Sequence, residues 1–382
     1  MLRFFGLIIA FFLFSVSFVN GQVKVRLFAS QLPESAIFTV VEGEYAFEGL
    51  PNVFHKNDLV VISKYKDKLA VKPHQSQGFV VDSIILKPRT EASSFSLRIN
   101  TLPAVTQFYN GDLACYHDLS TLVMINNCNL EDYIAGVVRA EGGANRPREY
   151  TKTQAIITRT YLFAHFDKHI HDRYNVCDDT HCQVFSGITS DPVINSASIE
   201  TKGLVIIDKN GALISSSFHA NCGGMTASSK DVWVSDLPYL RSVVDPHCAN
   251  TRSSVWEKKY TLQEWTDYLK KSGYTGDISA PSTFNFPQSR RWTHYKVGSV
   301  SLTSEKMRSD LGLRSAFFSV VADNNSVTLK GRGYGHGVGL CQEGAMGMAT
   351  KGNNYSEIIS FYYSGVIITD LKNVKSASNT IR

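Results

Sequence analysis

Short apolar stretches with partial alternation dominate the N-terminal part of the chain. They are rich in Val, Ile and Phe and are separated by Pro, Gly, Asn and Lys; in chain order they read VKVRLFA, FTVVEGEYAF, DLVVISKY, KLAVK, FVVDSIIL and SFSLRIN. This pattern predicts a β-rich region over residues 22–104. No Pro-rich or Ser-rich linker follows it, so we expect it to pack against the rest of the chain.

The pattern changes to helical spacing in the segment EDYIAGVVRAE, residues 131–141. Glu141 follows Val137 by four residues, so it lies on the apolar face of the predicted helix. We expect it to be at least partly buried, which would raise the pKa of its carboxyl, as would the negative C-terminal end of the helix. The alternative is an exposed side chain at a frayed helix end before Gly142 and Gly143.

A second helix is predicted to open near residues 145–147, where Asn145 can cap and Pro147 suits the first turn, and to continue through TKTQAIITRTYLFAHF. Arg159 is the only formal charge in its middle, so the helix is expected to be buried on several faces. Arg159 then needs an internal acceptor. If Arg159 has a functional role, Glu141 or a substrate group would be this acceptor. If its role is structural, the acceptor would be another carboxylate or backbone carbonyls.

Residues 250–310 carry a further pattern. WEKKYTLQEWTDYLKKSGY has helical periodicity and predicts an inserted helix, and SVSLTSEKMRSDLGL predicts a capped helix before the strand-like AFFSVV. The chain is therefore predicted to be an α+β protein, in which a β-rich N-terminal portion packs on a mixed α/β core.

The first 21 residues have the features of a secretory signal peptide. Arg3 supplies the positive charge, FFGLIIAFFLFSVSFV is the apolar core, and the residues before Gln22 suit cleavage. A retained membrane anchor is the alternative, but an apolar run of about sixteen residues is shorter than the ~20 that a spanning helix needs. We expect the mature chain to be exported, to the periplasm or outside the cell.

Composition narrows the function classes. The chain has 382 residues, of which 43% are hydrophobic and 19% charged, as in a globular protein with a sizeable core. The formal net charge is +5, without a dense basic run or an aromatic platform, so nucleic acid is not an expected partner. A mild positive charge would favour encounter with an anionic polymer, weakly at ordinary salt.

The segment HDRYNVCDDTHC concentrates potential metal ligands within twelve residues. The candidates are His171, Cys177, His181 and Cys182. Two thiolates and two imidazoles suit tetrahedral zinc. A disulfide between the two cysteines, with two surface histidines, is the alternative in an oxidising compartment. His219 and Cys222 are alternative ligands if the fold brings them close.

The other cysteines do not point to a nucleophile. The chain has seven cysteines, so they cannot all pair with one another. Two pairings are open, Cys115 with Cys128 across a predicted hairpin and Cys222 with Cys248. Cys341 has only His336 nearby in sequence to activate it, so it is a poor candidate for nucleophilic catalysis.

Several separate blocks, taken together, resemble the SpoIID/LytB group of bacterial cell-wall proteins. They are TLVMINNCNLEDYIAGVVRAEGG, KTQAIITRTYLFAH, HCQVFSG, ETKGLVI, SFHANCGGMT, LPYLRSVVDP, LGLRSAFFSV and GRGYGHGVGLCQEGAMGMATKGNNYSEIISFYYSGV. The resemblance covers roughly residues 105–370 and implies a SpoIID-type catalytic domain there, followed by a C-terminal tail, 371–382. The chain departs from the family pattern at Gly142 and Gly143, where many members carry an apolar residue and proline.

The resemblance implies a peptidoglycan lytic transglycosylase. In members characterised as enzymes, the glutamate that matches Glu141 is the catalytic acid. They cleave glycan strands between N-acetylmuramic acid and N-acetylglucosamine and leave 1,6-anhydro ends. The resemblance also implies zinc at the His/Cys segment, in a structural role because four protein ligands leave no open position. No organic cofactor is expected. The residues expected to bind substrate or orient Glu141 are Gln154, Arg159, Tyr161, Gln183, Tyr334, His336 and Gln342.

Some of these assignments have alternatives. His336 lies among alternating glycines that permit close backbone approach, and it is either a sugar contact or a buried structural histidine. Ordinary glycosidases use two carboxylates, and the weaker partners for Glu141 here are Asp178, Asp179 and Glu343. A lytic transglycosylase needs only one, because the 6-hydroxyl of the substrate attacks the anomeric carbon.

Two rival functions remain at this stage. The first is a non-catalytic wall-binding modifier of an autolysin or amidase, since the LytB side of the family is described as a modifier. The second is a zinc amidase acting on stem peptides, which would need an open metal position. In each case the expected partner is peptidoglycan, intact or stripped of its stem peptides, and a cell-wall amidase is a candidate protein partner.

Overall fold

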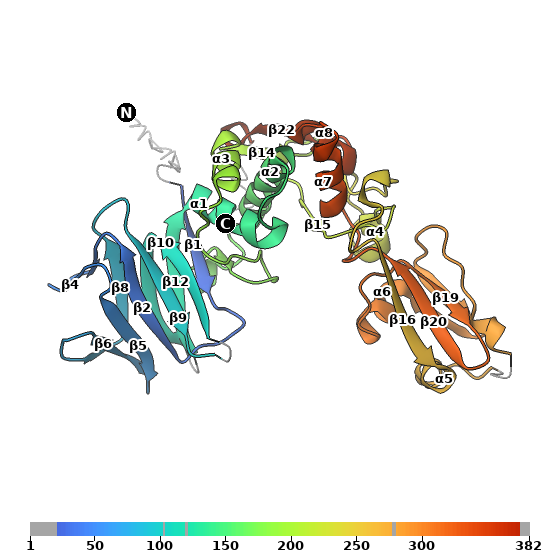
Figure 1. Ribbon diagram of the computed structural model, residues 1–382, viewed down its shortest axis with the longest axis horizontal. Helices are drawn as coiled ribbons and strands as arrows, with labels where there is room; N and C mark the ends of the chain where they lie inside the picture. The colour runs from blue at the N-terminus through green and yellow to red at the C-terminus, as the bar shows by residue number, and fades with distance from the viewer. Residues whose placement is uncertain (1–20, 102–103, 119–120, 277–279, 375–382) are drawn as a thin grey trace, which may run out of the picture.

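The computed structural model describes residues 21–101, 104–118, 121–276 and 280–374. Figure 1 shows these residues as an arch, with β-sheets at the left, a cluster of helices at the top centre and a smaller α/β body at the right. No helix in the described ranges is long and apolar enough to cross a membrane. The predicted signal peptide lies outside the described residues except for its last position, as does most of the predicted tail, and both stay predictions.

Two sheets form the N-terminal part of the molecule. Their strands are β1 (Gln22–Leu27), β2 (Ser35–Glu42), β3 (Tyr45–Phe47), β4 (Val53–Phe54), β5 (Leu59–Tyr65), β6 (Lys68–Pro73), β7 (Phe79–Val81), β8 (Ser83–Pro88), β9 (Ser94–Ile99), β10 (Val105–Asn110), β11 (Asp112–Asp118), β12 (Thr121–Asn129) and β13 (Val176–Cys177). One sheet has the order β13-β1-β12-β11-β8-β3-β4 and the other β10-β9-β2-β5-β6-β7. Buried and more exposed residues alternate along β2 and β9, as expected when one face of a sheet covers a core.

The predicted strands are all present, and the sheets extend beyond the predicted boundary at residue 104. β10, β11 and β12 belong to the two sheets, and β12 pairs with β1 over six residues, from Gln22 opposite Asn129 to Leu27 opposite Met124. The strand that leads into the first helix is therefore also the neighbour of the first strand of the chain.

Five helices form the cluster at the top centre (Figure 1). They are α1 (Leu130–Gly142), α2 (Arg148–Ala164), α3 (Pro192–Glu200), α7 (Gln342–Thr350) and α8 (Tyr355–Tyr362). Helix α1 contacts strands β1 and β12 of the seven-stranded sheet. Asn129 caps α1 by accepting a hydrogen bond from the backbone of Glu131, and Gly143 ends it with a φ of 80°. The predicted cap of α2 by Asn145 is wrong, because that residue has a φ of 56° and Pro147 occupies the cap position.

Helix α2 separates two hydrophobic cores. Ala155 and Leu162 pack into the core between the sheets, whereas Tyr150, Ile156 and Ile157 pack into a second core with α7 and α8. The helix is therefore buried on several faces, as its nearly uncharged sequence predicted.

Short elements lie between the helices. They are η1 (Ile170–Asp172), β14 (Leu204–Ile207), β15 (Phe218–His219), α4 (Ser229–Val232), η2 (Pro246–Cys248), β21 (Leu340–Cys341), β22 (Ile367–Asp370) and η4 (Leu371–Asn373). β14 pairs antiparallel with β22, and β15 pairs parallel with β21. The second pairing brings the glycine block, residues 331–339, beside the segment that contains β15.

The third body has its own core around Trp265. It comprises β16 (Val255–Thr261), α5 (Leu262–Lys271), η3 (Pro281–Phe284), β17 (His294–Val297), β18 (Val300–Thr303), α6 (Ser304–Asp310), β19 (Phe318–Ala322) and β20 (Ser326–Arg332). The capped helix and the strand after it are confirmed as α6 and β19. The first half of the predicted inserted helix is instead strand β16, and the helix begins only after Thr261, which forms a capping box with Glu264.

Candidate functional site

Glu141 lies in the last turn of α1 and is half-buried. Its Oε1 accepts a hydrogen bond from the backbone N–H of Val184 at 2.9 Å, and its other carboxyl oxygen has no hydrogen-bond partner among the described residues. Burial raises the pKa of Glu141 above its usual value, and the Val184 N–H opposes this shift because it stabilises the charged form. The side chain is thus partly desolvated, as the helical spacing predicted.

A close approach of two backbones brings Val184 to Glu141. Gly136 in α1 faces the segment 183–187: a Cβ on it would lie 2.3 Å from the backbone oxygen of Gly187 and 2.5 Å from the ring of Phe185. Such contacts are too short for any other residue, so glycine is required at 136 for this packing. The Val184 amide is a part of the site that sequence reasoning missed, since a backbone donor leaves no sequence signal.

Gln342, the first residue of α7, directly follows β21 and connects this part of the chain to the end of α1, where Glu141 lies. Its Nε2 donates to the backbone oxygen of Glu141 at 3.1 Å. Tyr150 lies next to the end of α1, where a Cβ on Gly142 would come within 3.2 Å of its hydroxyl. That hydroxyl and Gln154 Oε1 are buried without a hydrogen-bond partner in the described part of the chain. Tyr150 was not predicted from the sequence, because nothing in its surroundings distinguishes it from a core tyrosine.

Arg159 does not contact Glu141, which corrects the expectation that it holds that residue or binds sugar. It is 0% exposed, and its Nη2 donates to Glu131 Oε2 at 2.5 Å. Its Nη1 donates to the backbone oxygens of Thr201 and Leu204 at 2.9 and 3.2 Å. The structural alternative therefore applies, because the first turn of α1 supplies the acceptor carboxylate.

Both ring nitrogens of His336 bond to the backbone, which favours the structural alternative for this residue. Nδ1 accepts from the N–H of Val338 at 3.0 Å, so the ring proton is on Nε2, which donates to the oxygen of Phe218 at 2.9 Å. Burial lowers the pKa of His336 to about 4. Tyr334 differs in being 50% exposed, with the Arg314 guanidinium 6.0 Å from its ring centre.

The two remaining predicted binding residues are Gln183, directly before Val184, and Tyr161, on α2. Gln183 is buried, and its Oε1 accepts from the hydroxyl of Tyr133 at 3.3 Å. Tyr161 stacks on His165 with ring centres 4.2 Å apart, and burial raises its pKa to about 12. No hydrogen bond joins either side chain to Glu141 in the described chain, so their predicted contact with the acid is not direct.

The other carboxylates named from the sequence are engaged elsewhere. Asp178 accepts from the backbone N–H groups of Phe28 and Ala29 at 2.5 and 3.0 Å, and burial raises its pKa to about 6. Asp179 accepts from the backbone of His181 at 2.8 Å. Glu343 accepts from Asn221 Nδ2 at 2.6 Å and from Thr251 Oγ1. Asp178 thus has both carboxyl oxygens engaged, whereas Glu141 keeps one oxygen without a hydrogen-bond donor in the described chain.

A cavity of about 540 Å³ opens beside the segment that holds Glu141. Its lining comprises Phe28, Ser30, Gln31, Gln107, Asp178, Asp179, Thr180, His181, Val184, Phe185 and Ser186. Glu141 is not among these residues. Val184 takes part in both features, since it lines the cavity and donates its N–H to Glu141.

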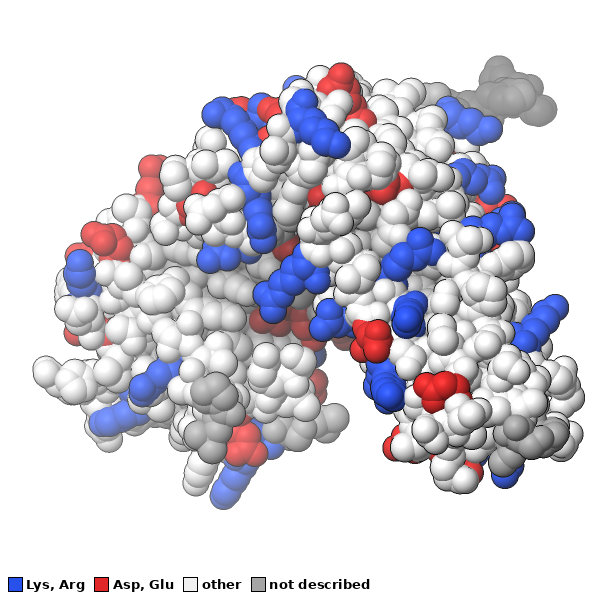
Figure 2. All heavy atoms as spheres, turned by 45° about the vertical axis from the view of Figure 1, so that its right-hand side comes forward, with Lys and Arg blue, Asp and Glu red and all other residues white. Residues whose placement is uncertain are grey.

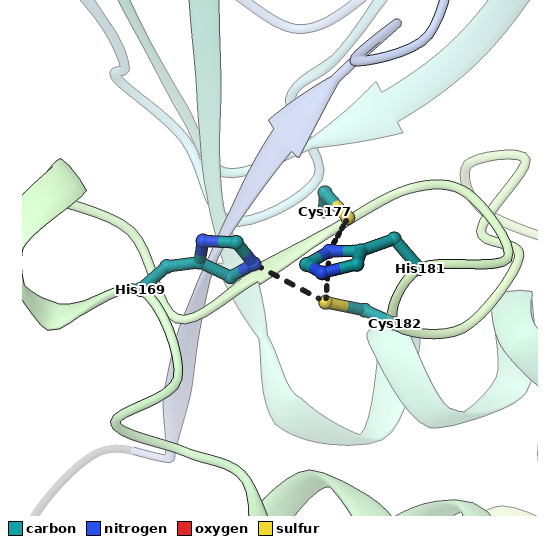
Figure 3. A group of neighbouring side chains, drawn as sticks. All are labelled: His169, Cys177, His181 and Cys182. Carbon is teal, nitrogen blue, oxygen red and sulfur yellow. Dashed lines mark hydrogen bonds between the residues drawn. The ribbon is translucent and has the colours of Figure 1, made fainter.

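Four side chains form a potential metal centre next to this cavity, and Figure 3 shows them pointing toward one another. They are His169, Cys177, His181 and Cys182, whose ligand atoms all lie within 4.8 Å of one another. The structure thus corrects the predicted set, with His169 in place of His171. Cys182 Sγ lies 3.5 Å from His169 Nε2, and Cys177 Sγ lies 3.6 Å from His181 Nδ1.

His171 is excluded from the group by the turn that contains it. It sits in η1 and lines a separate pocket with Asp172, Arg173 and Tyr174. Spacing alone did not distinguish it from His169, because both histidines precede the cysteines by a few residues.

The surroundings of the group suit a zinc-type cation. His169 Nδ1 lies 3.0 Å from Asp172 Oδ2, which leaves Nε2 free to act as a ligand. Two thiolates and two imidazoles are ligands that zinc accepts, and four of them fill a tetrahedral shell. The residues present therefore fit the metal that the resemblance implies, as a closed site.

The remaining cysteine expectations have different outcomes. All seven cysteines are free thiols in the structure. Cys115 lies opposite Met124 in the sheet and Cys128 opposite Val23, so the two do not face each other as proposed for a disulfide. Cys222, an alternative ligand in the sequence analysis, belongs to a second group of cysteines.

The surface charge is mixed. Figure 2 shows Lys, Arg, Asp and Glu side chains interspersed over one face of the molecule, with uncharged surface between them.

Comparison with known proteins gives consistent matches. The family model SpoIID, described as Stage II sporulation protein, matches residues 118–207, which hold α1 and α2. An uncharacterized protein of Brachyspira hyodysenteriae is 32% identical over 271 residues, covering 70% of this chain and 73% of that protein. The stage II sporulation protein D of Bacillus amyloliquefaciens is 28% identical over 262 residues, covering 64% of this chain and 76% of that one.

A further relative is much longer than the region it shares. The amidase enhancer of Bacillus subtilis is 28% identical over 289 residues, which cover 62% of this chain but only 40% of that protein. The family model and the alignments with these relatives indicate the same family. This chain belongs to the SpoIID family.

Proposed function

We propose that this protein is a peptidoglycan lytic transglycosylase with Glu141 as its general acid and base. The observation that carries the proposal is the setting of that carboxyl, which is half-buried, has a raised pKa and keeps one oxygen without a protein donor. Because Val184 donates to Oε1, a proton on the acid belongs on Oε2, which can then donate it to a substrate. A raised pKa keeps part of the acid protonated closer to neutral pH.

The proposed reaction uses this one group twice. Glu141 first gives its proton to the oxygen that joins N-acetylmuramic acid to N-acetylglucosamine, and the bond from that oxygen to the anomeric carbon breaks. The resulting carboxylate then takes the proton of the 6-hydroxyl of the same muramic sugar. At the same time, the oxygen of this 6-hydroxyl bonds to the anomeric carbon. The products are a 1,6-anhydro end and a free 4-hydroxyl, and Glu141 returns to its protonated form. Positioned general acid–base groups contribute about 10²–10⁴-fold to such reactions.

The proposal includes a structural zinc ion at the His169 group. Zinc would fix the turn from Cys177 to Cys182, which leads directly into the segment whose Val184 N–H holds Glu141. Since four protein ligands fill the shell, the chemistry that the ion supplies there is coordination of this turn. A zinc amidase would need an open ligand position, so it is the less favoured function.

The test is mass spectrometry of muropeptides released by the purified mature chain from peptidoglycan, both intact and stripped of stem peptides. The parent protein is expected to release anhydro-muramic ends, and Glu141→Gln to reduce this release by at least about 10²-fold. Asp178→Asn is the matched control, because it also replaces a half-buried carboxyl with a raised pKa close to Val184. Its products should remain anhydro.

Other products would overturn the assignment in different ways. Reducing ends would require a second catalytic group, and equal release by parent and Glu141→Gln would remove Glu141 from the chemistry. A preference for stripped strands would agree with the assignment, and it would mean that the enzyme acts after an amidase has removed the stem peptides.

A second candidate function is activation of a cell-wall amidase. It is favoured by one observation, the similarity to a protein named amidase enhancer. In that case the purified chain would bind peptidoglycan without releasing glycan products and would increase the release of stem peptides by an added amidase. Glu141→Gln should then enhance the amidase as well as the parent does.

Both functions require the protein to meet peptidoglycan outside the cytoplasmic membrane. We therefore propose that the signal peptide directs export to the periplasm or the cell surface. N-terminal sequencing of the envelope-associated protein should find a chain that begins near Gln22.

A further inference from the structure

A second group of metal-ligand side chains lies at the start of α7 and takes no part in the proposed reaction. Its members are Cys222, Asp245, Cys248 and Cys341, and their ligand atoms all lie within 4.8 Å of one another. All four are buried, and their three cysteines belong to the core that α2 shares with α7 and α8. The group shares no residue with the His169 group.

The sulfur of Cys341 is surrounded by hydrogen-bond donors. It accepts from the backbone N–H of Cys222 at 3.2 Å and from that of Gly344 at 3.3 Å. Cys341 is also the N-cap of α7, whose positive end favours a negative charge. Donors and a helix N-terminus stabilise a thiolate, which is the form in which cysteine binds a metal.

Asp245 supplies an independent observation. It is 0% exposed, and its oxygens accept from the backbone of His247 at 2.8 Å and from the hydroxyl of Tyr362 at 2.9 Å. No Lys or Arg of the described chain forms an ion pair with it. Its Oδ2 lies 3.3 Å from Cys222 Sγ, on the side of the cysteines, so a cation bound there would compensate a buried negative charge.

We propose that these four side chains bind one divalent thiophilic cation of the zinc type in a closed structural site. The Sγ atoms of Cys222 and Cys248 lie 3.4 Å apart, slightly closer than the roughly 3.8 Å between two sulfurs that each lie 2.3 Å from a tetrahedral zinc ion. Three thiolates select a soft metal over Mg²⁺ or Ca²⁺. Binding displaces the thiol protons to solvent, and no electrons are transferred.

The charge of the filled site is partly balanced from outside. Three thiolates and one carboxylate exceed the charge of a divalent ion by two negative charges. Arg291 Nη2 donates to the backbone oxygen of Cys222 at 2.8 Å and brings a positive charge beside the group. The neighbouring chain is also built for close approach, since a Cβ on Gly344 would lie 2.2 Å from Asp245 Oδ2.

The site joins segments that are far apart in the chain. Cys222 follows β15, Cys248 ends η2, and Cys341 ends β21. The third body, from β16 to β20, leaves and re-enters the helical core between the second and third of these segments. A bound metal would therefore fasten the base of the third body to the core that contains α7.

The test measures the metal content of the full mature chain, purified without chelators, by inductively coupled plasma mass spectrometry. Cys182→Ser removes a ligand of the His169 group, and it should retain about one metal ion per chain, since it leaves the second group intact. Adding Cys248→Ser should remove that ion. Cobalt supplied in place of zinc to Cys182→Ser should give thiolate-to-cobalt charge-transfer absorption, which measures sulfur ligation independently of activity.

A milder variant keeps the test informative if Cys248→Ser fails to fold. Asp245→Asn preserves the shape of the carboxyl group but removes its charge, and it should lose its metal to a chelator at a lower concentration than Cys182→Ser alone does.

The alternative occupant is a disulfide between Cys222 and Cys248. In the denatured, chelated Cys182→Ser chain, which has six cysteines, this disulfide would leave four titratable thiols, whereas the metal site leaves six. Four thiols, or a folded Cys182→Ser protein without metal, would overturn the proposal. Neither result bears on Glu141, so the proposed transglycosylase function is tested separately.

Discussion

Glu141 illustrates a conflict between stability and chemistry at a single residue. Burial raises the pKa of its carboxyl, so the folded protein holds this proton more tightly than the unfolded chain does. The contribution of Glu141 to the free energy of unfolding is therefore fully present below its unfolded pKa and is lost as the pH rises through its folded pKa. Its charged form destabilises the fold, although the proposed reaction requires that form.

Replacing Glu141 with Gln should consequently stabilise the protein at neutral pH while it removes activity. The amide keeps an oxygen for the Val184 N–H and carries no charge to desolvate. Thermal unfolding of parent and variant, followed from pH 4 to 8, should show a difference that is small at the acid end and grows with pH. A variant that is less stable than the parent at pH 8 would mean that the charged carboxylate is favoured in the fold.

His336 shows how a residue in a specific motif can have a structural role. Its two nitrogens are occupied by backbone groups, and burial lowers its pKa to about 4, so its ring is neutral throughout the physiological range. The residue-level pattern of alternating glycines correctly predicted close backbone approach here, but it did not show which atoms approach. The contact proved to be between the glycine block and β15, not between this histidine and a cavity.

At the scale of elements, the packing of α1 against the segment 183–187 sets the position of Val184. Gly136→Ala would place a Cβ 2.3 Å from the oxygen of Gly187, which must move the segment away from the helix. Overpacking of this kind costs about 1–3 kcal/mol, and the displaced Val184 N–H should weaken its bond to Glu141. We expect both a lower free energy of unfolding in urea and a several-fold loss of anhydro product from the folded protein.

Helices α1 and α2 are joined by the buried pair of Glu131 and Arg159. Arg159→Met would leave a largely buried carboxylate without its cation, and breaking a buried pair in this way costs about 3–5 kcal/mol. The double variant Glu131→Gln with Arg159→Met should recover part of this loss, since no charge then remains unpaired. Urea unfolding of the single and double variants measures the difference. If Arg159 bound substrate, the double variant would stay inactive even when it is fully folded.

The sequence predicted most elements because their signals are local. Alternation identified the strands of the two N-terminal sheets, and the capping residue Thr303 together with its periodic helix identified α6. Helix α5 was misplaced at its start because WEKKYT alternates only weakly, and its strand character comes from pairing with β20, which is distant in sequence. The same limit applies to the site: helical spacing indicated the burial of Glu141, whereas Val184, Tyr150 and His169 are brought there by tertiary packing.

For the whole molecule, the His169 group lies where the seven-stranded sheet meets the helices. His169 follows α2, whereas Cys177 lies in β13, which pairs with β1 at the edge of the seven-stranded sheet. Cys182 then begins the short segment that ends at the close contact with α1. A metal ion here would hold the helical cluster to the sheet edge and, through that segment, set the position of the candidate acid.

A substitution next to the His169 group that weakens metal binding without replacing a ligand should therefore reduce activity while the hydrophobic cores stay folded. Asp172 contacts His169 Nδ1 at 3.0 Å and is itself exposed, so Asp172→Asn changes the orientation and basicity of one ligand while leaving the packing intact. Loss of such a partner typically costs about 10–100-fold in metal affinity or activity. In a chelator titration, the variant should lose metal and anhydro product together at lower chelator concentrations than the parent does, with its circular dichroism unchanged. Product formation that persists after this metal has left would mean that Val184 holds Glu141 without help from the His169 group.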